Sequence, residues 1–523
     1  MRRVSWWFLL YVLGAASASP AAGAPACYDV RDFGAQPDGK TLCTPAIQAA
    51  VDKCSAAGGG TVYLPPGTFL SGTIYMKSGV TLHLDSGCTL LGSTNLSDYP
   101  PTVPALRSYT DNYTDKSLLY GEKLSRIALA GRGTIDSQGK AFQGPYKVRP
   151  YLIRFIECRD VAVEGVTIRN SPMWVQHYLA CDDVRLSGIT VQSHVNHNND
   201  GIDIDSCRRV TITGCNIDSG DDAIVLKSTT ARPCREVAVS GCVLRSTCSA
   251  LKMGTESNGG FQNIVLTGCA IHDTRLGGVS LEIVDGGTMD RVVVSNLTMT
   301  GVGAPLFLRL GNRARPFQEG TAKPGVGSMR DITISNIEAT GANPTGCAIS
   351  GLPEARIENL TLSNIRLSFA GGGTVEQAVR PIPEEPEKYP EYGMFGKLPA
   401  YGLYFRHVDG LKLLNVQLQL AAADQRHAIV LDDVTNATLD GLDTAWSNGA
   451  ASPLRLTNAR EVLIRGCRPP ADPDVFLRVQ GAKTAGVTLL GNDFSQVQKA
   501  VETEANVAPA AVAQLGNREV EKR

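Results

Sequence analysis

The stretch "CRRVTITGCNI" at residues 207–217 alternates apolar and polar residues, as a half-buried β-strand does. Similar stretches begin at Cys158, Cys181, Cys234 and Phe261. The five starting points are separated in turn by 23, 26, 27 and 27 residues. Weaker copies continue toward the C-terminus, among them "MRDITISNIEA" at 329–339 and "AREVLIRGCRP" at 459–469. A regular period of this length is typical of a solenoid.

A second apolar strand follows in each repeat, for example "DGIDIDS" at 200–206 and "DAIVLKS" at 222–228. One repeat is too small to bury its own apolar face, whereas stacked repeats bury a continuous core. The pattern therefore predicts an all-β fold, a single right-handed parallel β-helix over residues 27–496. The L-x-x-L-x-L pattern and the asparagine ladder of leucine-rich repeats are not evident. A short amphipathic helix after Cys43 is expected to cap the first coil, and 497–523 to form a frayed helix, tail or cap.

The first residues predict export from the cytoplasm. Residues 1–26 combine a basic start, an apolar run and small residues, which is typical of a cleaved signal peptide, with an uncleaved anchor as the alternative. No later stretch is apolar over the roughly 18 residues of a membrane span. The formal net charge of −1 gives no reason to expect nucleic acid or an anionic membrane as a partner. We expect a secreted or periplasmic monomer.

Seven of the fourteen cysteines fall into two phases of the repeat. Cys158, Cys181, Cys207 and Cys234 share one phase, and a second set begins at Cys215. In stacked coils, these would form two ladders of buried side chains, and cysteine packs well as a small hydrophobic residue. We expect mostly free thiols, with a disulfide framework as the alternative. No CxxC pair points to zinc.

The register of the repeats brings acidic residues together. Aligning the apolar positions places Asp200 beside Asp222 on the neighbouring coil, with Asp221 next to it. Carboxylates this close repel, so the pKa of at least one should be raised. A protonated acid beside an ionised base is what glycoside hydrolysis needs. Turn-filling is the alternative, which we prefer for Asp205 and Asp218, and calcium binding is another. We expect no metal and no cofactor.

Two acidic motifs resemble those of the polygalacturonase family of glycoside hydrolases, family 28. They are "NNDGID" at 198–203 and "GDDAI" at 220–224, supported by "RNSPMW" at 169–174 and N-terminal stretches. The resemblance implies hydrolysis by single displacement with inversion. It further implies that Asp221 is the general acid, that Asp200 and Asp222 activate water, and that Asn199 and Asp203 belong to the substrate site.

Two departures from the family affect the substrate site. The family usually has Gly-His-Gly one coil after the paired aspartates, and here Ser249 stands where the histidine would be. His194 and His197, shortly before the first motif, could replace it or could simply be turn residues.

The family also has an Arg-x-Lys pair that holds the substrate carboxylate. Here Ser280 and Glu282 occupy those positions, and we expect a charge at Glu282 to repel galacturonate. Lys252 and Arg309 lie on the same predicted face and could bind the substrate instead, or could be solvated charges.

A proline- and tyrosine-rich segment at 371–401 interrupts the repeat. Long ordered loops of solenoids tend to line a binding face, so Tyr389, Tyr392 and Tyr401 are candidates to stack on sugar rings. The leading hypothesis is a secreted hydrolase of pectic polysaccharide or oligosaccharide, of polygalacturonase or exo-galacturonidase type. The alternatives are a rhamnogalacturonan-type hydrolase, a pectate-lyase-like enzyme and a non-catalytic carbohydrate-binding β-helix.

Overall fold

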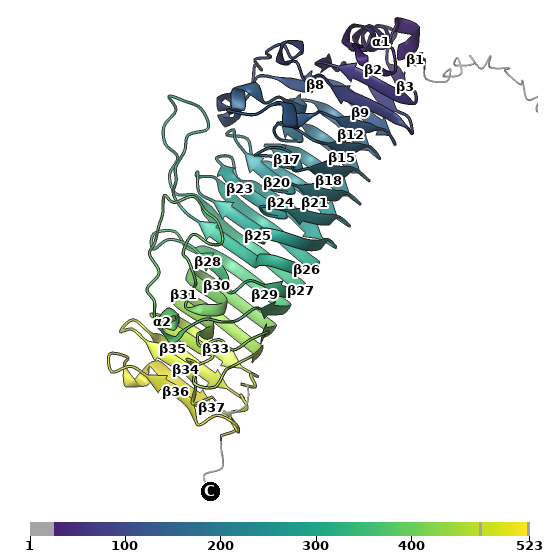
Figure 1. Cartoon of the computed structure of the whole chain (residues 1–523). Helices are drawn as coiled ribbons and strands as arrows, with labels where there is room; N and C mark the ends of the chain where they lie inside the picture. The colour runs from purple at the N-terminus through teal and green to yellow at the C-terminus, as the bar shows by residue number, and fades with distance from the viewer. Residues whose placement is uncertain (1–25, 470–472, 520–523) are drawn as a thin grey trace, which may run out of the picture.

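The computed structural model describes residues 26–469 and 473–519, which form one elongated stack of coils (Figure 1). Its 37 strands belong to a single sheet that winds around the long axis, and the strands of neighbouring coils pair in parallel. The predicted right-handed parallel β-helix is confirmed. All but the last residue of the proposed signal peptide lies outside the described residues.

Each coil crosses three faces, and strands on one face pair with strands on the same face of the next coil. The first face contains β1 (Cys27–Asp29), β3 (Gly60–Leu64), β6 (Val80–Leu84), β9 (Ser125–Gly131), β12 (Arg159–Glu164), β15 (Asp182–Ser187), β18 (Arg208–Thr213), β21 (Cys234–Ser240), β24 (Phe261–Thr267), β33 (Arg460–Arg465), β35 (Ala485–Leu490) and β37 (Val512–Leu515). The second face contains β2 (Asp38–Leu42), β4 (Gly67–Ser71), β7 (Cys88–Gly92), β10 (Thr134–Asp136), β13 (Thr167–Arg169), β16 (Thr190–Ser193), β19 (Asn216–Ser219) and β22 (Val243–Ser246).

The third face contains β5 (Ile74–Tyr75), β8 (Ser117–Glu122), β11 (Tyr151–Ile156), β14 (Gln176–Leu179), β17 (Ile202–Asp205), β20 (Ile224–Ser228), β23 (Leu251–Ser257), β28 (Cys347–Ser350), β32 (Leu454–Thr457), β34 (Val475–Gln480) and β36 (Lys499–Thr503). Longer strands continue around the corners between faces: β25 (Ala270–Ile283), β26 (Thr288–Leu310), β27 (Ser328–Ala342), β29 (Ile357–Phe369), β30 (Ala400–Leu420) and β31 (His427–Thr444).

The register on the third face agrees with the one predicted from the alternating pattern. Ile202, Ile224, Leu251, Val279 and Leu306 follow one another on successive coils, and each is at most 1% exposed. Such a stack removes the apolar side chains from water along the whole axis, which supplies the main stabilising term. The side chains between them point outward, so the third face carries the polar residues on which function depends.

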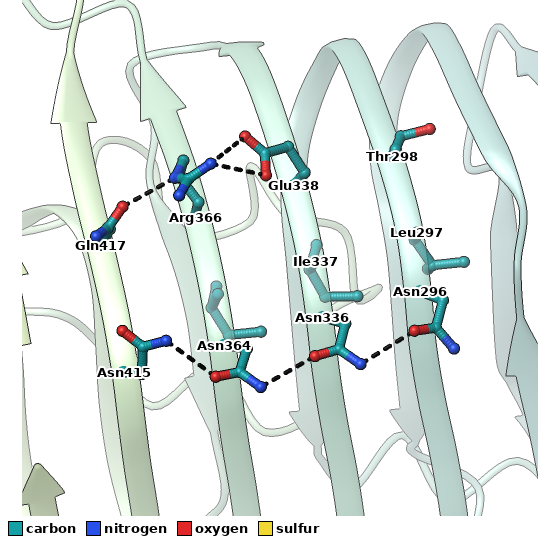
Figure 2. A pocket seen from close by; sticks show the side chains of 11 residues that line it. Asn296, Leu297, Thr298, Asn336, Ile337, Glu338, Asn364, Arg366, Asn415 and Gln417 are labelled. Carbon is teal, nitrogen blue, oxygen red and sulfur yellow. Dashed lines mark hydrogen bonds and ion pairs between the residues drawn. The ribbon is translucent and has the colours of Figure 1, made fainter. Parts of the chain in front are cut away.

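Stacked asparagines line one corner of the later coils, where the sequence analysis had recognised no asparagine ladder (Figure 2). The side-chain amides of Asn336, Asn364 and Asn415 each donate to the asparagine of the preceding coil over 2.9–3.1 Å, starting at Asn296. All four residues have φ between 54° and 56°. Asparagine tolerates this left-handed conformation better than other non-glycine residues, so the ladder satisfies both the turn and its polar groups.

The two ends of the described chain differ from each other. Helix α1 (Thr44–Ala56) buries Ile47 and Val51 against the first coil, as expected of the cap. At the other end, β36 and β37 pair in parallel with β34 and β35. The frayed helix expected for 497–523 is therefore wrong for the described part, 497–519, where the chain adds further strands to the solenoid. The described helices include none with the length and apolarity needed to cross a membrane.

The cysteines are all free thiols, and all but Cys27 and Cys248 are buried or nearly so. They stack as predicted: the backbone N–H of Cys181 donates to the sulfur of Cys207 on the next coil over 3.3 Å. The ladders thus contribute packing rather than cross-links.

Candidate active site

A cavity of about 490 Å³ lies over the third face near the middle of the sequence. Its floor is formed by residues at the ends of β17, β20 and β23. Its walls come from loops that are far apart in the sequence, around residues 109–113, 146, 313–315 and 389. Several long loops extend from the same side of the solenoid in Figure 1. The cavity combines a rigid floor with walls that the repeat pattern does not specify.

The cavity contains the three aspartates that the sequence brought together. Asp200, just before β17, and Asp221 and Asp222, just before β20, all line it. The backbone N–H of Gly201 donates to the carbonyl of Asp222 over 2.9 Å, which fixes the two motifs on adjacent coils. Glycine is required there, because a Cβ at residue 201 would lie 2.5 Å from the carbonyl oxygen of Ala223. The predicted acidic cluster is present.

The environment of the aspartates disfavours full ionisation of the group. Burial, followed by the charges of Asp221 and Asp203, raises the pKa of Asp200 well above its ordinary value. Burial and the charge of Asp222 raise the pKa of Asp221. Asp222 accepts the backbone N–H of Ser249 over 3.0 Å and lies 3.1 Å from the Lys252 ammonium. Asp200 and Asp221 therefore retain a proton to higher pH than an isolated aspartate does.

Two buried lysines balance this negative charge. Lys227 lies 3.4–3.6 Å from carboxylate oxygens of Asp200, Asp203 and Glu256, and its ammonium is 4.6 Å from the ring centre of Trp174. Burial disfavours the charged lysine, but these carboxylates outweigh it and raise the pKa of Lys227 well above its ordinary value. The pKa of Lys252 is raised in the same way: burial opposes the charge, and nearby carboxylates, Asp222 above all, outweigh it. Both lysines therefore stay charged, and both line the cavity.

Some residues assigned to the substrate site from the sequence lie outside the cavity lining. Asn199 is buried, and its amide donates to the carbonyls of Ser171 and Met173 over 2.8 and 3.1 Å. It positions the segment that carries Trp174. Asp203 is fully buried beside Lys227, and neither of its oxygens accepts a hydrogen bond. These two residues support the site from beneath it.

Arg309 lies away from the cavity. It is 1% exposed, and its guanidinium donates to the carbonyls of Glu384 and Glu385 over 2.6 and 3.1 Å and to Ser350 and Gly351. The sequence correctly placed Arg309 on the outward side of the strand. The loop at 371–399 covers that position, however, and uses Arg309 as an anchor.

The residues that depart from the family motifs lie close together but do not form an anion clamp. The hydroxyls of Ser249 and Ser280 are 3.4 Å apart. Glu282 is 1% exposed, and burial, opposed by Lys252, raises its pKa to about 8. Below that pH Glu282 is mostly protonated, which weakens the repulsion of galacturonate expected from a charged glutamate. His194 pairs with Asp218 and, like His197, does not line the cavity.

Aromatic and cationic wall residues were largely missed from the sequence. The aromatic rings that line the cavity are those of Tyr109, Tyr113, Tyr146, Trp174 and Tyr389. Of the three tyrosines expected from 371–401, only Tyr389 is among them. Tyr392 accepts a hydrogen bond from Asn343, and Tyr401 is buried in the core. Arg313 and Arg315, in the "GNRARPF" segment at 311–317, also line the cavity. In the sequence they follow an apolar strand, and no motif marks them as site residues.

The acidic cluster suits calcium poorly. Asp221, Asp222 and Cys248 bring ligand atoms within 4.8 Å of one another. Calcium takes six to eight oxygen ligands, and here one of three potential ligands is a thiol and an ammonium already lies beside Asp222. The geometry fits proton transfer better than metal binding.

Comparisons with known proteins agree with this picture. The profile of glycosyl hydrolases family 28 matches residues 54–385. A probable polygalacturonase of Vitis vinifera is 36% identical over 38% of this chain and 43% of its own length. An exo-poly-alpha-D-galacturonosidase of Dickeya chrysanthemi is 38% identical over 22% of this chain and 20% of its own. The chain thus spans less than half the length of these two relatives.

A solved structure extends the similarity to the fold. The exopolygalacturonase from Thermotoga maritima superposes with a TM-score of 0.58 and 25% identity, over 66% of this chain and 89% of that one. With the family profile covering more than half of the sequence, the chain belongs to glycosyl hydrolases family 28.

Proposed function

We propose that this protein is a secreted glycoside hydrolase that cleaves pectic polysaccharide, of polygalacturonase or exo-galacturonidase type. The observation that carries the proposal is the group of three aspartates in a cavity walled by aromatic rings. Aromatic faces suit the apolar faces of sugar rings, and paired carboxyl groups supply acid and base for glycosidic cleavage.

In the proposed mechanism, Asp221 donates a proton to the leaving glycosidic oxygen. Its raised pKa keeps it protonated where an ordinary aspartate would be ionised. Asp200 and Asp222 together activate the attacking water: the ionised carboxylate of the pair accepts the one proton that the water loses as its oxygen bonds to the anomeric carbon. Because water attacks from the face opposite the leaving group, a single displacement inverts the configuration. The ammonium of Lys252, 3.1 Å from Asp222, forms an ion pair with this carboxylate beside the general acid.

The shape of the cavity favours action at a chain end. Tyr109, Tyr146, Arg313 and Tyr389, from loops far apart in the sequence, line the cavity together with the acids. The middle of a polymer needs a groove open at both ends, whereas a terminal sugar fits an enclosed site. This supports the exo-galacturonidase form of the proposal.

A rhamnogalacturonan-type hydrolase is the second candidate, because Ser280 and Glu282 replace the cations of the family clamp. The deciding experiment incubates the protein with homogalacturonan and with rhamnogalacturonan oligosaccharides and identifies the products by mass spectrometry. Galacturonate monomers released from homogalacturonan support the leading form, and cleavage of rhamnogalacturonan alone supports the second. Products that absorb as unsaturated uronates would instead show a lyase, and intact substrates would contradict the enzyme.

A further inference from the structure

The cations in the cavity differ in whether a carboxylate already neutralises them. Lys227 and Lys252 contact the acids of the floor. Arg315 donates to Asp285 over 2.5 Å and lies 3.4 Å from Glu256. The charge of each is therefore committed to the protein itself, which leaves little of it for a ligand.

Arg313 is different. It lies three residues beyond the end of β26, is partly exposed, and lines the cavity. Among the described residues, no carboxylate lies within 4.0 Å of its guanidinium. Its one side-chain hydrogen bond goes to the Thr255 hydroxyl over 3.4 Å, a long contact. Most of its N–H donors are thus available to a ligand in the cavity.

The position of Arg313 is nevertheless fixed. Its guanidinium carbon lies 4.9 Å from the ring centre of Tyr389, and the Lys252 ammonium lies 5.8 Å from the same ring. Contacts of this kind attract a cation to the face of an aromatic ring. The ring of Tyr389 therefore attracts two cations that line the cavity, Arg313 and Lys252. A planar guanidinium held in this way is suited to bidentate binding of a carboxylate.

We propose that Arg313, held by Tyr389, binds the carboxylate of an acidic sugar residue in the cavity and determines the preference for uronates. The proposal rests on the proposed function for its class of substrate. In the family, the cations that hold the substrate carboxylate stand at the strand positions of Ser280 and Glu282. In this protein, the cation would instead be Arg313, in the loop that follows β26. Neither of those residues offers a positive charge, and Glu282 is buried.

Binding of monosaccharides by titration calorimetry tests the proposal without relying on turnover. The probes are galacturonate and galactose, which share the same ring and differ in the carboxylate. Wild type should bind galacturonate the more tightly, and Arg313→Gln should weaken galacturonate binding by at least about 30-fold while leaving galactose unchanged. Arg313→Lys should retain part of the preference, because lysine keeps the positive charge but lacks the planar guanidinium that donates two hydrogen bonds to one carboxylate.

Arg330→Gln serves as the control, since Arg330 is exposed and pairs with Asp290 away from the cavity. The proposal is overturned if wild type shows no preference for galacturonate, or if folded Arg313→Gln retains that preference. A uronate preference that depends on Arg313, in a protein that cleaves no pectic substrate, would uphold the inference and contradict the proposed hydrolase. Cleavage with a preference unaffected by Arg313 would do the reverse.

Discussion

The catalytic assignment depends most on a single residue, Asp221. We expect Asp221→Asn to lower kcat by about 10²–10⁴, because asparagine cannot supply a proton to the leaving oxygen. The melting temperature should change little, since asparagine has the same shape as aspartic acid and, like the protonated side chain, carries no charge. Asp218→Asn is the matched control: Asp218 lies in the same coil and pairs with His194 and Arg245 outside the cavity. Near wild-type turnover by Asp221→Asn would refute the acid assignment.

Glu282 makes a separate prediction about stability and pH. Its pKa is about 8 in the folded protein against an ordinary value of 4.5, so folding binds a proton in this range. The folded state is therefore penalised increasingly as pH rises from 4.5 toward 8. Glu282→Gln mimics the protonated form and should unfold at higher urea concentration than wild type at pH 7, by on the order of 3 kcal/mol, with almost no difference at pH 4.5.

The free energy of unfolding of wild type and of Glu282→Gln is compared at pH 4.5 and at pH 7. Glu338→Gln, on the exposed second face, controls for general effects of removing a carboxylate. A stabilisation by Glu282→Gln that is the same at pH 4.5 and pH 7 would show that the glutamate is not the titrating group.

The sequence predicted the acids and Lys252, but not the loop cations Arg313 and Arg315. Asp200, Asp221 and Asp222 lie just before strands whose period-2 pattern fixes the register, so their proximity follows from alignment alone. Arg313 lies in a loop, where no periodicity specifies direction. Arg309 is a second example. Its outward position on the strand was predicted correctly, but the position of the loop that covers it could not be predicted from the sequence.

At the scale of elements, the loop at 371–399 is anchored on the solenoid and contributes Tyr389 to the wall of the cavity. Two hydrogen bonds from Arg309, to the carbonyls of Glu384 and Glu385, hold it, and His407 adds a contact of 3.0 Å to Glu384. Helix α2 (Val375–Ala378) and Tyr389 belong to this loop. We expect the loop to remain in place only while its carbonyls have these donors, because unpaired buried carbonyls are costly.

Arg309→Met tests this anchor. It should leave the carbonyls of Glu384 and Glu385 without donors, destabilise the protein by roughly 1–3 kcal/mol and expose the loop to limited proteolysis. Activity should fall through displacement of Tyr389. Arg366→Met is the control: Arg366 bridges Glu338 and Gln417 on an exposed face (Figure 2), where ion pairs contribute about 0–1 kcal/mol. Equal protease resistance of Arg309→Met and wild type would contradict the anchoring role.

At the scale of the whole molecule, the solenoid and the site follow different rules. The repeat of alternating residues predicted the parallel β-helix, because stacking is the only way for each short repeat to bury its apolar face. The last coils were not predicted, since residues 497–523 are too polar and alanine-rich to show the alternation clearly. Long loops extend from one side of an otherwise regular stack (Figure 1), and residues of several loops line the cavity.

The most direct test of the central claim follows the first product of cleavage by time-resolved proton NMR, with short oligogalacturonides and rhamnogalacturonan fragments as substrates. Saturated products that first appear with the anomeric configuration opposite to that of the broken bond, and do not form with Asp221→Asn, are the result we predict. Products that retain the configuration, or no cleavage of either substrate by wild type, would contradict the account.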